Sequence, residues 1–297
     1  MDFYKISIYN NKYLIRRTLV ILLDMLSVAK KAIHLYRRDG LYYTCKRSIA
    51  FLIAHSPLAY RASFTYTKHT RLVFAPTLLT YGIFANRKTR HTDVDLIKKY
   101  TPSGGTMLDV GGNIGSITVP LAEHVGPKGV VHIFEPSPKF FNIVTKNIAL
   151  NNFSDRVTAH QVALGAKVGT VHLNESVADD TTNHIATTGT AVPQNTLDSF
   201  TNTLSQIDFL KIDVEGYELE VLKGATATLA KTNCLYIEFI PSQLIRAGSK
   251  PQEVLTILNK YFNIFTETAG ELTPFEYVEG ASVHPDLLCL PKQIQVI

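Results

Sequence analysis

Cysteine is scarce in this chain, and the three cysteines it has are poorly placed for a shared role. Cys45, Cys234 and Cys289 lie far apart and are odd in number. This pattern favours neither a disulfide framework nor a zinc site. A reducing compartment suits such a chain best, so we expect a cytoplasmic protein.

The sequence also lacks an apolar run long enough to cross a membrane. The most apolar part, within residues 13–36, has about a dozen apolar positions and carries Asp24, whereas a spanning helix needs about 20. No small-residue cleavage site accompanies it, so a secretory signal peptide is not expected. Two interpretations stay open: a helix that packs on the main domain, or an amphipathic helix on a membrane surface with its basic residues toward the headgroups.

Acidic residues are few in the first third of the chain. Residues 1–100 hold 18 Lys and Arg against 5 Asp and Glu, and residues 101–297 hold 12 against 20, so the two parts carry +13 and −8. This asymmetry indicates that the first part faces something anionic, a membrane surface or an acidic ligand, although a solvated basic face explains it equally well. Peripheral membrane contact through residues 1–100 is the prediction to be tested, with the solvated face as its alternative, and no nucleic-acid partner is expected.

The same division describes the expected domains. Residues 1–100 are predicted to be a basic, mainly helical region with a hairpin, and residues 101–297 the main domain. An apolar run at residues 49–60 continues the helical part, and residues 71–84 predict two short strands around their proline. A short helix over residues 93–99 leads to a break rich in proline and glycine, which marks the boundary.

The most informative stretch is residues 107–115, Met-Leu-Asp-Val-Gly-Gly-Asn-Ile-Gly, where an apolar strand enters a glycine-rich turn and a helical run follows. Glycines there permit positive φ angles and a close approach of the backbone to a ligand, while free N–H groups of the helix start point toward it. The dinucleotide fingerprint G-x-G-x-x-G is not matched, because Asn113 stands where its second glycine is needed. A small-molecule site is therefore predicted, with a tight turn that binds nothing as the alternative.

Beyond the boundary, predicted strands and helices alternate at intervals typical of βαβ units. The strands are expected at residues 107–111, 130–135, 157–162, 207–213 and 235–239. This rhythm indicates a mostly parallel sheet with helices on both faces, in which ligands bind outside the carboxyl ends of the strands.

Carboxylates stand at three of these strand ends. Glu135, 20 residues after Gly115, can accept both hydroxyl hydrogens of a ribose. Asp213 ends a central strand on the same face as Lys211, and we interpret it as a functional residue, with helix capping as the alternative. Glu238 ends another strand, and two roles remain open for it: a functional carboxylate or a solvated one.

The segments beside these strand ends are predicted from composition. Glu215 and Glu218 would lie in the first turns of a helix, where negative charge is favoured, so a structural role is expected of both. Residues 174–194 are polar, rich in threonine and without periodicity, and are predicted to form a long loop. His184 in that loop is an alternative base, although a lone loop histidine is more often solvated.

Five segments of the main domain combine into one pattern: Leu-Asp-Val-Gly-Gly-Asn-Ile-Gly at 108–115, Phe-Glu-Pro at 134–136, Val-Ala-Leu-Gly at 162–165, Thr-Leu-Asp at 196–198, and Leu-Lys-Ile-Asp-Val-Glu-Gly-Tyr-Glu-Leu-Glu-Val-Leu-Lys-Gly-Ala at 210–225. This combination resembles the FkbM-type S-adenosylmethionine-dependent methyltransferases over roughly residues 105–290. The last segment is the most specific, since all class I methyltransferases share glycine turns and strand-end acids. One departure is Gly112, where the family usually has alanine and where a smaller residue should be tolerated.

The resemblance implies an α/β, Rossmann-like class I fold with a mostly parallel seven-stranded sheet, whose reversed last strand would be residues 286–290. It also implies S-adenosylmethionine as cofactor, with its methionine end at the glycine turn, its ribose at Glu135 and its adenine near Ala163 and Leu164. Asp109 would orient the turn or the cofactor amine. The implied cofactor-binding residues are Asp109, Gly111, Gly112, Asn113, Gly115, Glu135, Ala163 and Leu164.

Methyl transfer to a hydroxyl needs a base or a metal ion, because a protonated hydroxyl is a poor nucleophile. Asp213 is our first candidate for base or ligand, and with Glu238 it could hold a hard cation such as Mg²⁺. We predict an O-methyltransferase for a sugar, glycolipid or other hydroxylated metabolite. The alternatives are an NAD(P)-dependent oxidoreductase, which Asn113 and the Asp213 segment oppose, and a noncatalytic membrane-associated scaffold with a relic cofactor fold.

Overall fold

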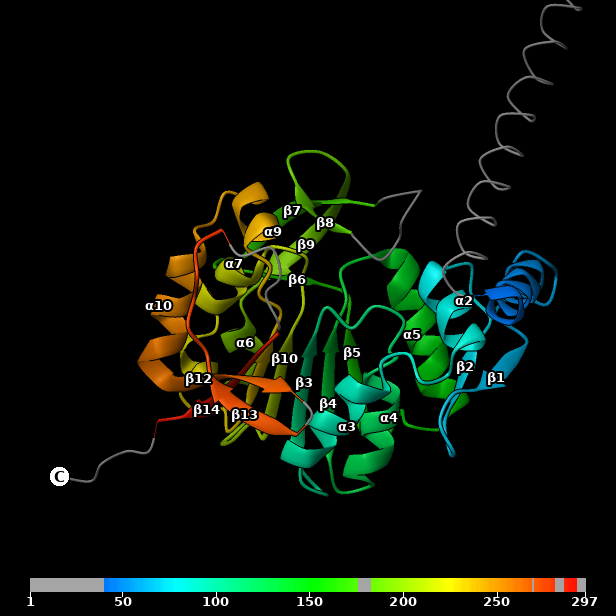
Figure 1. Cartoon of the computed structure of the whole chain (residues 1–297), viewed down its shortest axis with the longest axis horizontal. Helices are drawn as coiled ribbons and strands as arrows, with labels where there is room; N and C mark the ends of the chain where they lie inside the picture. Colours follow the sequence, from blue (N-terminus) through cyan, green and yellow to red (C-terminus); the bar gives the residue numbers. More distant parts are fainter. Residues whose placement is uncertain (1–39, 176–182, 269, 281–285, 293–297) are drawn as a thin grey trace, which may run out of the picture.

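The computed structural model describes residues 40–175, 183–268, 270–280 and 286–292. The expectations for residues 13–36 fall outside these ranges. Within them an eight-stranded sheet forms the centre, and helices cover both of its faces (Figure 1). Its strand order is β13-β12-β14-β11-β10-β3-β4-β5.

The five predicted parallel strands are confirmed and lie side by side. They are β3 (Thr106–Val110), β4 (Val130–Phe134), β5 (Val157–His160), β10 (Phe209–Ile212) and β11 (Leu235–Ile237).

The predicted reversed strand is confirmed as β14 (Leu287–Pro291), which runs antiparallel between β11 and β12 (Phe262–Thr268). With β12 the sheet has the seven strands whose number the resemblance implied, although no strand was expected at residues 262–268. An eighth, β13 (Glu271–Pro274), pairs antiparallel with β12 at the edge of the sheet.

Side chains of the central strands alternate between two cores, because successive residues of a strand point to opposite faces. Met107 and Phe209 belong to the core under α3 (His91–Tyr100), α4 (Thr118–Val125) and α5 (Pro138–Leu150). Leu108 and Leu210 belong to the other core, covered by α6 (Leu197–Thr201), α7 (Glu218–Lys223), α8 (Thr226–Leu229), α9 (Pro241–Arg246) and α10 (Pro251–Tyr261).

The described part of the basic region packs on the α5 side of the sheet. It contains the helical residues 40–54, the antiparallel pair β1 (Ser63–Thr65) and β2 (Arg71–Val73), and α2 (Leu78–Ala85). The expected strand after Pro76 is wrong, because that run forms α2. Thr77 caps the helix by accepting a hydrogen bond from the Thr80 N–H at 3.0 Å, and the hairpin is made by β1 and β2 instead.

Asn147 of α5 connects this region to the glycine turn. Its Oδ1 accepts a hydrogen bond from the Val73 N–H, and its Nδ2 donates to the Ile114 carbonyl, both at 2.8 Å. The Asn147 side chain is fully buried, so both bonds are shielded from water.

A second sheet rises above the carboxyl ends of β4 and β5. It is formed by β6 (Ala163–Leu164), β9 (Thr190–Asn195), β7 (Gly169–Asn174) and β8 (His184–Ala186), in that order. The prediction of one long loop over residues 174–194 is therefore wrong for β8 and β9, which pair with β7. No helix among the described residues combines the length and apolar character needed to cross a membrane.

Candidate active site

A cavity with a volume of about 110 Å³ opens at the carboxyl ends of β3, β4 and β10. Nine of the predicted site residues line it: Asp109, Gly111, Gly112, Asn113, Glu135, Ala163, Leu164, His184 and Asp213. Gly115 and Glu238 are not part of its wall.

The glycine turn is shaped by close contacts that leave no room for larger side chains. Gly111 has φ +82°, and a Cβ on it would lie 1.8 Å from the Asp213 carbonyl oxygen. A Cβ on Gly112 would lie 2.1 Å from Ile133 Cδ1, so the isoleucine side chain occupies the space that a larger residue at position 112 would need. Gly115 has φ +80° and packs against Val144, which gives it a packing role at the start of α4.

Glu135 ties the turn to the end of β4. Its two carboxylate oxygens accept hydrogen bonds from the Asn113 and Ser137 N–H groups, each at 2.8 Å. Burial raises the pKa of Glu135 to about 7, against the opposing effect of these two bonds. Two N–H donors leave acceptor capacity on the carboxylate, which lines the cavity as the ribose prediction requires.

Lys211 lies between the two strand-end aspartates on the buried side of the cavity. Its Nζ is 3.1 Å from Asp213 Oδ2 and 3.7 Å from Asp109 Oδ1, and it is hydrogen-bonded only to the former. Burial disfavours its charge, but Asp213 and Asp109 outweigh burial and raise the pKa of Lys211. Thr118 Oγ1 donates to the other oxygen of Asp109, at 2.5 Å. The aspartates are therefore held in fixed positions by a cation and a hydroxyl.

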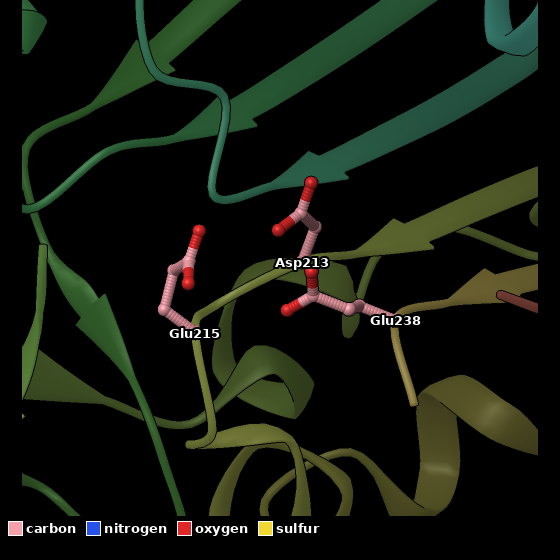
Figure 2. A group of neighbouring side chains, drawn as sticks. All are labelled: Asp213, Glu215 and Glu238. Atoms are coloured by element: carbon pink, nitrogen blue, oxygen red, sulfur yellow. The ribbon is translucent and has the colours of Figure 1, made fainter. Parts of the chain in front are cut away.

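Three carboxylates lie close together beyond the carboxyl ends of β10 and β11. One carboxylate oxygen from each of Asp213, Glu215 and Glu238 lies within 4.8 Å of the other two, and Figure 2 shows the three side chains as neighbours. Burial, followed by repulsion from Asp213, raises the pKa of Glu215 to about 7 and that of Glu238 to about 9. Repulsion of this kind is relieved when the cluster takes up a proton or a cation.

The structure corrects the prediction for Glu215 and supports that for Glu218. Glu215 precedes α7 with φ +57°, lines the cavity, and accepts a hydrogen bond from Gln243 Nε2 at 2.8 Å. Glu218 is buried and accepts hydrogen bonds from the Val214 and Gly216 N–H groups. Only Glu218, at the start of α7, therefore has the expected structural role, and Glu215 belongs to the site.

The second sheet closes the other side of the cavity. Ala163 and Leu164 of β6, Leu173 of β7 and His184 of β8 form this wall together with Phe134 at the end of β4. His184 thus lies on a strand beside the cavity and not in an irregular loop. The apolar part of the wall has the character expected of an adenine site.

Arg90 is a site residue that the sequence did not indicate. It lines the cavity from the N-terminal side and adopts φ +66° where α3 begins. Asn113 and Glu215, which also line the cavity, have positive φ values of 50° and 57°. Non-glycine residues in this conformation concentrate at functional sites, which is the signal that locates Arg90 in the fold.

Comparison with known proteins agrees with this geometry. The family described as "Methyltransferase FkbM domain" matches residues 109–265, more than half of the chain. The chain therefore belongs to the FkbM methyltransferase family, and its strand order with the reversed β14 is that of the Rossmann-like class I fold. It is a methyltransferase, so the oxidoreductase alternative is removed.

Three curated relatives resemble the chain at low identity. "Methyltransferase 1" of Beauveria bassiana is 27% identical over 48% of this chain and 72% of its own length. "Hexuronic acid methyltransferase AglP" of Haloferax volcanii is 29% identical over 56% of this chain and 66% of its own length. "2-O-methyltransferase NoeI" of Sinorhizobium fredii is 24% identical over 59% of this chain and 78% of its own length.

Proposed function

We propose that this chain transfers a methyl group from S-adenosylmethionine to a hydroxyl oxygen of a sugar-containing acceptor. The observation that carries the proposal is that one cavity joins the glycine turn and Glu135 on one side to the carboxylate cluster at Asp213 on the other. The names of two relatives, a hexuronic acid methyltransferase and a 2-O-methyltransferase, support a sugar hydroxyl as the acceptor.

The cofactor half of the cavity fits S-adenosylmethionine by the chemistry of its wall. Glu135 offers remaining acceptor capacity for ribose hydroxyls, and Gly111 and Gly112 allow the backbone to approach the methionine part. Phe134, Ala163 and Leu164 offer an apolar wall for adenine. Asp109 would attract the cofactor's ammonium group while Lys211 and Thr118 hold it in place.

The acceptor half would orient a hydroxyl and remove its proton. Bound S-adenosylmethionine supplies an electrophilic methyl group on a sulfonium, which becomes a neutral thioether when the C–S bond breaks and the C–O bond forms. Asp213, held in place by Lys211, would accept a hydrogen bond from the acceptor hydroxyl. The proton of that hydroxyl would pass to the Asp213–Glu215–Glu238 cluster as the C–O bond forms. A carboxylate with a pKa near 7, such as Glu215, is well matched to this task at neutral pH. His184 remains the alternative base.

A divalent cation in the cluster is a second candidate, supported by separate observations. Three carboxylate oxygens lie close enough to share one ion, and Glu238 Oε2 is buried without a hydrogen-bond partner among the described residues. Such oxygen ligands suit Mg²⁺, which Asp213 and Glu238 would hold and which would make the acceptor hydroxyl more acidic.

Calorimetry and a labelled-methyl assay test the main proposal. S-adenosylhomocysteine should bind to the full chain and NAD should not. Asp213→Asn should keep this binding and lose about 10²–10⁴-fold of the methyl transfer to a panel of neutral and uronic-acid glycosides. Glu220→Gln, a charge change on the exposed side of α7, is the matched control and should keep full activity. Tight binding of NAD without S-adenosylhomocysteine would contradict the proposal.

Removal of divalent cations by chelation distinguishes a cluster that accepts a proton from a cluster that binds Mg²⁺. If Mg²⁺ is held, EDTA should abolish transfer, Mg²⁺ should restore it, and Mg²⁺ should raise the melting temperature of the native chain but not of Asp213→Asn. If methyl transfer is unchanged after exhaustive chelation, the hypothesis of a bound cation is rejected, and proton uptake by the carboxylates is retained.

A further inference from the structure

Exposed apolar side chains gather on the helical residues 40–54 and the turn after them. Twelve large apolar side chains of the described residues are strongly exposed, and seven of them lie between Leu41 and Leu58. Leu41 and Leu52 are 65% and 66% exposed, and with Cys45 and Ile49 between them they form a stripe along one face of the helix. In Figure 1 this helix, in blue, lies at the outer end of the molecule beside β1 and α2.

The opposite face of the same helix is buried and sets the orientation of the helix on the protein. Ala50 and Ala54 are 0% and 3% exposed and belong to the same core as Ile83 of α2 and Val144 of α5. Because the small residues seat the helix on the body of the protein, it cannot turn to bury its leucines without breaking that packing. Among the described residues the stripe therefore faces away from the core.

The described part of the chain that precedes Asp93 carries charge of one sign. Residues 40–92 contain no Asp or Glu and eight Lys or Arg. Lys46 lies beside the stripe with its Nζ 5.2 Å from the centre of the Tyr42 ring, and Arg61 is exposed in the segment after the helix. An apolar stripe amid cations suits an interface where acyl chains meet anionic headgroups. A second copy of the same surface would instead bring like charges together.

We propose that the helical residues 40–54 and Leu58 form a docking face for a membrane surface that contains anionic lipids. Apolar side chains of the stripe enter the boundary between headgroups and acyl chains, and the lysines and arginines contact lipid phosphates. The same basic region supplies Leu79 of α2 and Arg90 to the cavity wall. The proposal does not depend on which reaction the cavity supports.

Vesicle binding tests this face in the full chain. Wild type should co-sediment with vesicles of phosphatidylcholine and phosphatidylglycerol, bind pure phosphatidylcholine at least tenfold more weakly, and dissociate as salt is raised. Leu41→Ser/Leu52→Ser should weaken binding to the anionic vesicles at least tenfold. The matched control is Val168→Ser/Val278→Ser, which changes two equally exposed residues elsewhere and should bind as wild type does.

A fluorescent residue gives a second measurement. The chain has no tryptophan, so Leu52→Trp introduces a single probe whose emission should shift to the blue on anionic vesicles, while Val168→Trp should not shift. Unchanged vesicle binding by Leu41→Ser/Leu52→Ser would overturn the proposal and assign membrane contact to another segment. Absence of vesicle binding by wild type would also overturn it, as would a dimer that this double variant abolishes in the absence of lipid.

Discussion

Substitutions of Gly112 and Ile133 should have non-additive effects on stability, because the two residues share one space beside the glycine turn. An alanine Cβ at position 112 would lie 2.1 Å from Ile133 Cδ1 and 2.2 Å from its Cγ1, where about 3.4–4.0 Å is ordinary contact. Ile133 is 1% exposed and packed in the core, so it can give way only by displacing its neighbours. Overpacking of this kind costs about 1–3 kcal/mol.

Gly112→Ala should therefore lower the melting temperature by several degrees, at roughly 2–4 °C for each kcal/mol in a domain of this size. Ile133→Ala alone should cost about 2–5 kcal/mol through the cavity it creates. In the double variant the new methyl group partly fills that cavity, so the two losses should not add, with a coupling of about 0.5–3 kcal/mol.

Urea unfolding followed by circular dichroism measures the free energy of unfolding of the wild type, the two single variants and the double variant. Gly169→Ala is the matched control, because nothing lies within 4 Å of its added methyl group and it should change stability little. Strict additivity of Gly112→Ala and Ile133→Ala, or an unchanged melting temperature for Gly112→Ala, would refute the reasoning.

Three other variants test the buried polar groups. Lys211→Met leaves two strand-end aspartates without their cation and should cost about 3–5 kcal/mol, measured by urea unfolding, whereas an unchanged midpoint would contradict the ion-pair role. Asn147→Ala removes two buried hydrogen bonds and should cost about 2–4 kcal/mol in the same assay; a loss under 0.5 kcal/mol would contradict it. Burial, followed by a neighbouring histidine, lowers the pKa of His160 to about 4, below its unfolded value near 6.5. Protonation therefore favours the unfolded state, and stability should fall as pH drops from about 6.5 to about 4. His160→Phe should flatten the melting temperature over this window and exposed His172→Gln should not, and equal slopes for the two would refute the assignment.

The parallel strands and the glycine turn could be predicted because their causes are local. A strand buried on both faces is an apolar run, and the turn after β3 needs glycine at residues whose φ is positive. The reading of α2 as a strand failed because its residues are apolar almost all around, so the run carries no helical period. The Thr77 cap was the available signal for a helix.

Glu215 and Arg90 could not be assigned to the site from sequence, because distant residues place them there. Glu215 is held in its left-handed conformation by Gln243 Nε2 on its carboxylate and by Arg246, which donates to its carbonyl oxygen. Arg90 reaches the cavity only because α2 and α3 pack on the sheet face that carries Asp109. Contacts between such distant segments leave no spacing that a sequence pattern can detect.

The position of β14 makes it the link between two parts of the sheet. Because β14 lies between β11 and β12, the β12–β13 pair is joined to the parallel strands only through residues 287–291. During synthesis the strands that carry the glycine turn and Asp213 emerge first. Until β14 arrives, Leu235 and Ile237 of β11 form an open strand edge, which is where a partly made chain is most exposed to aggregation.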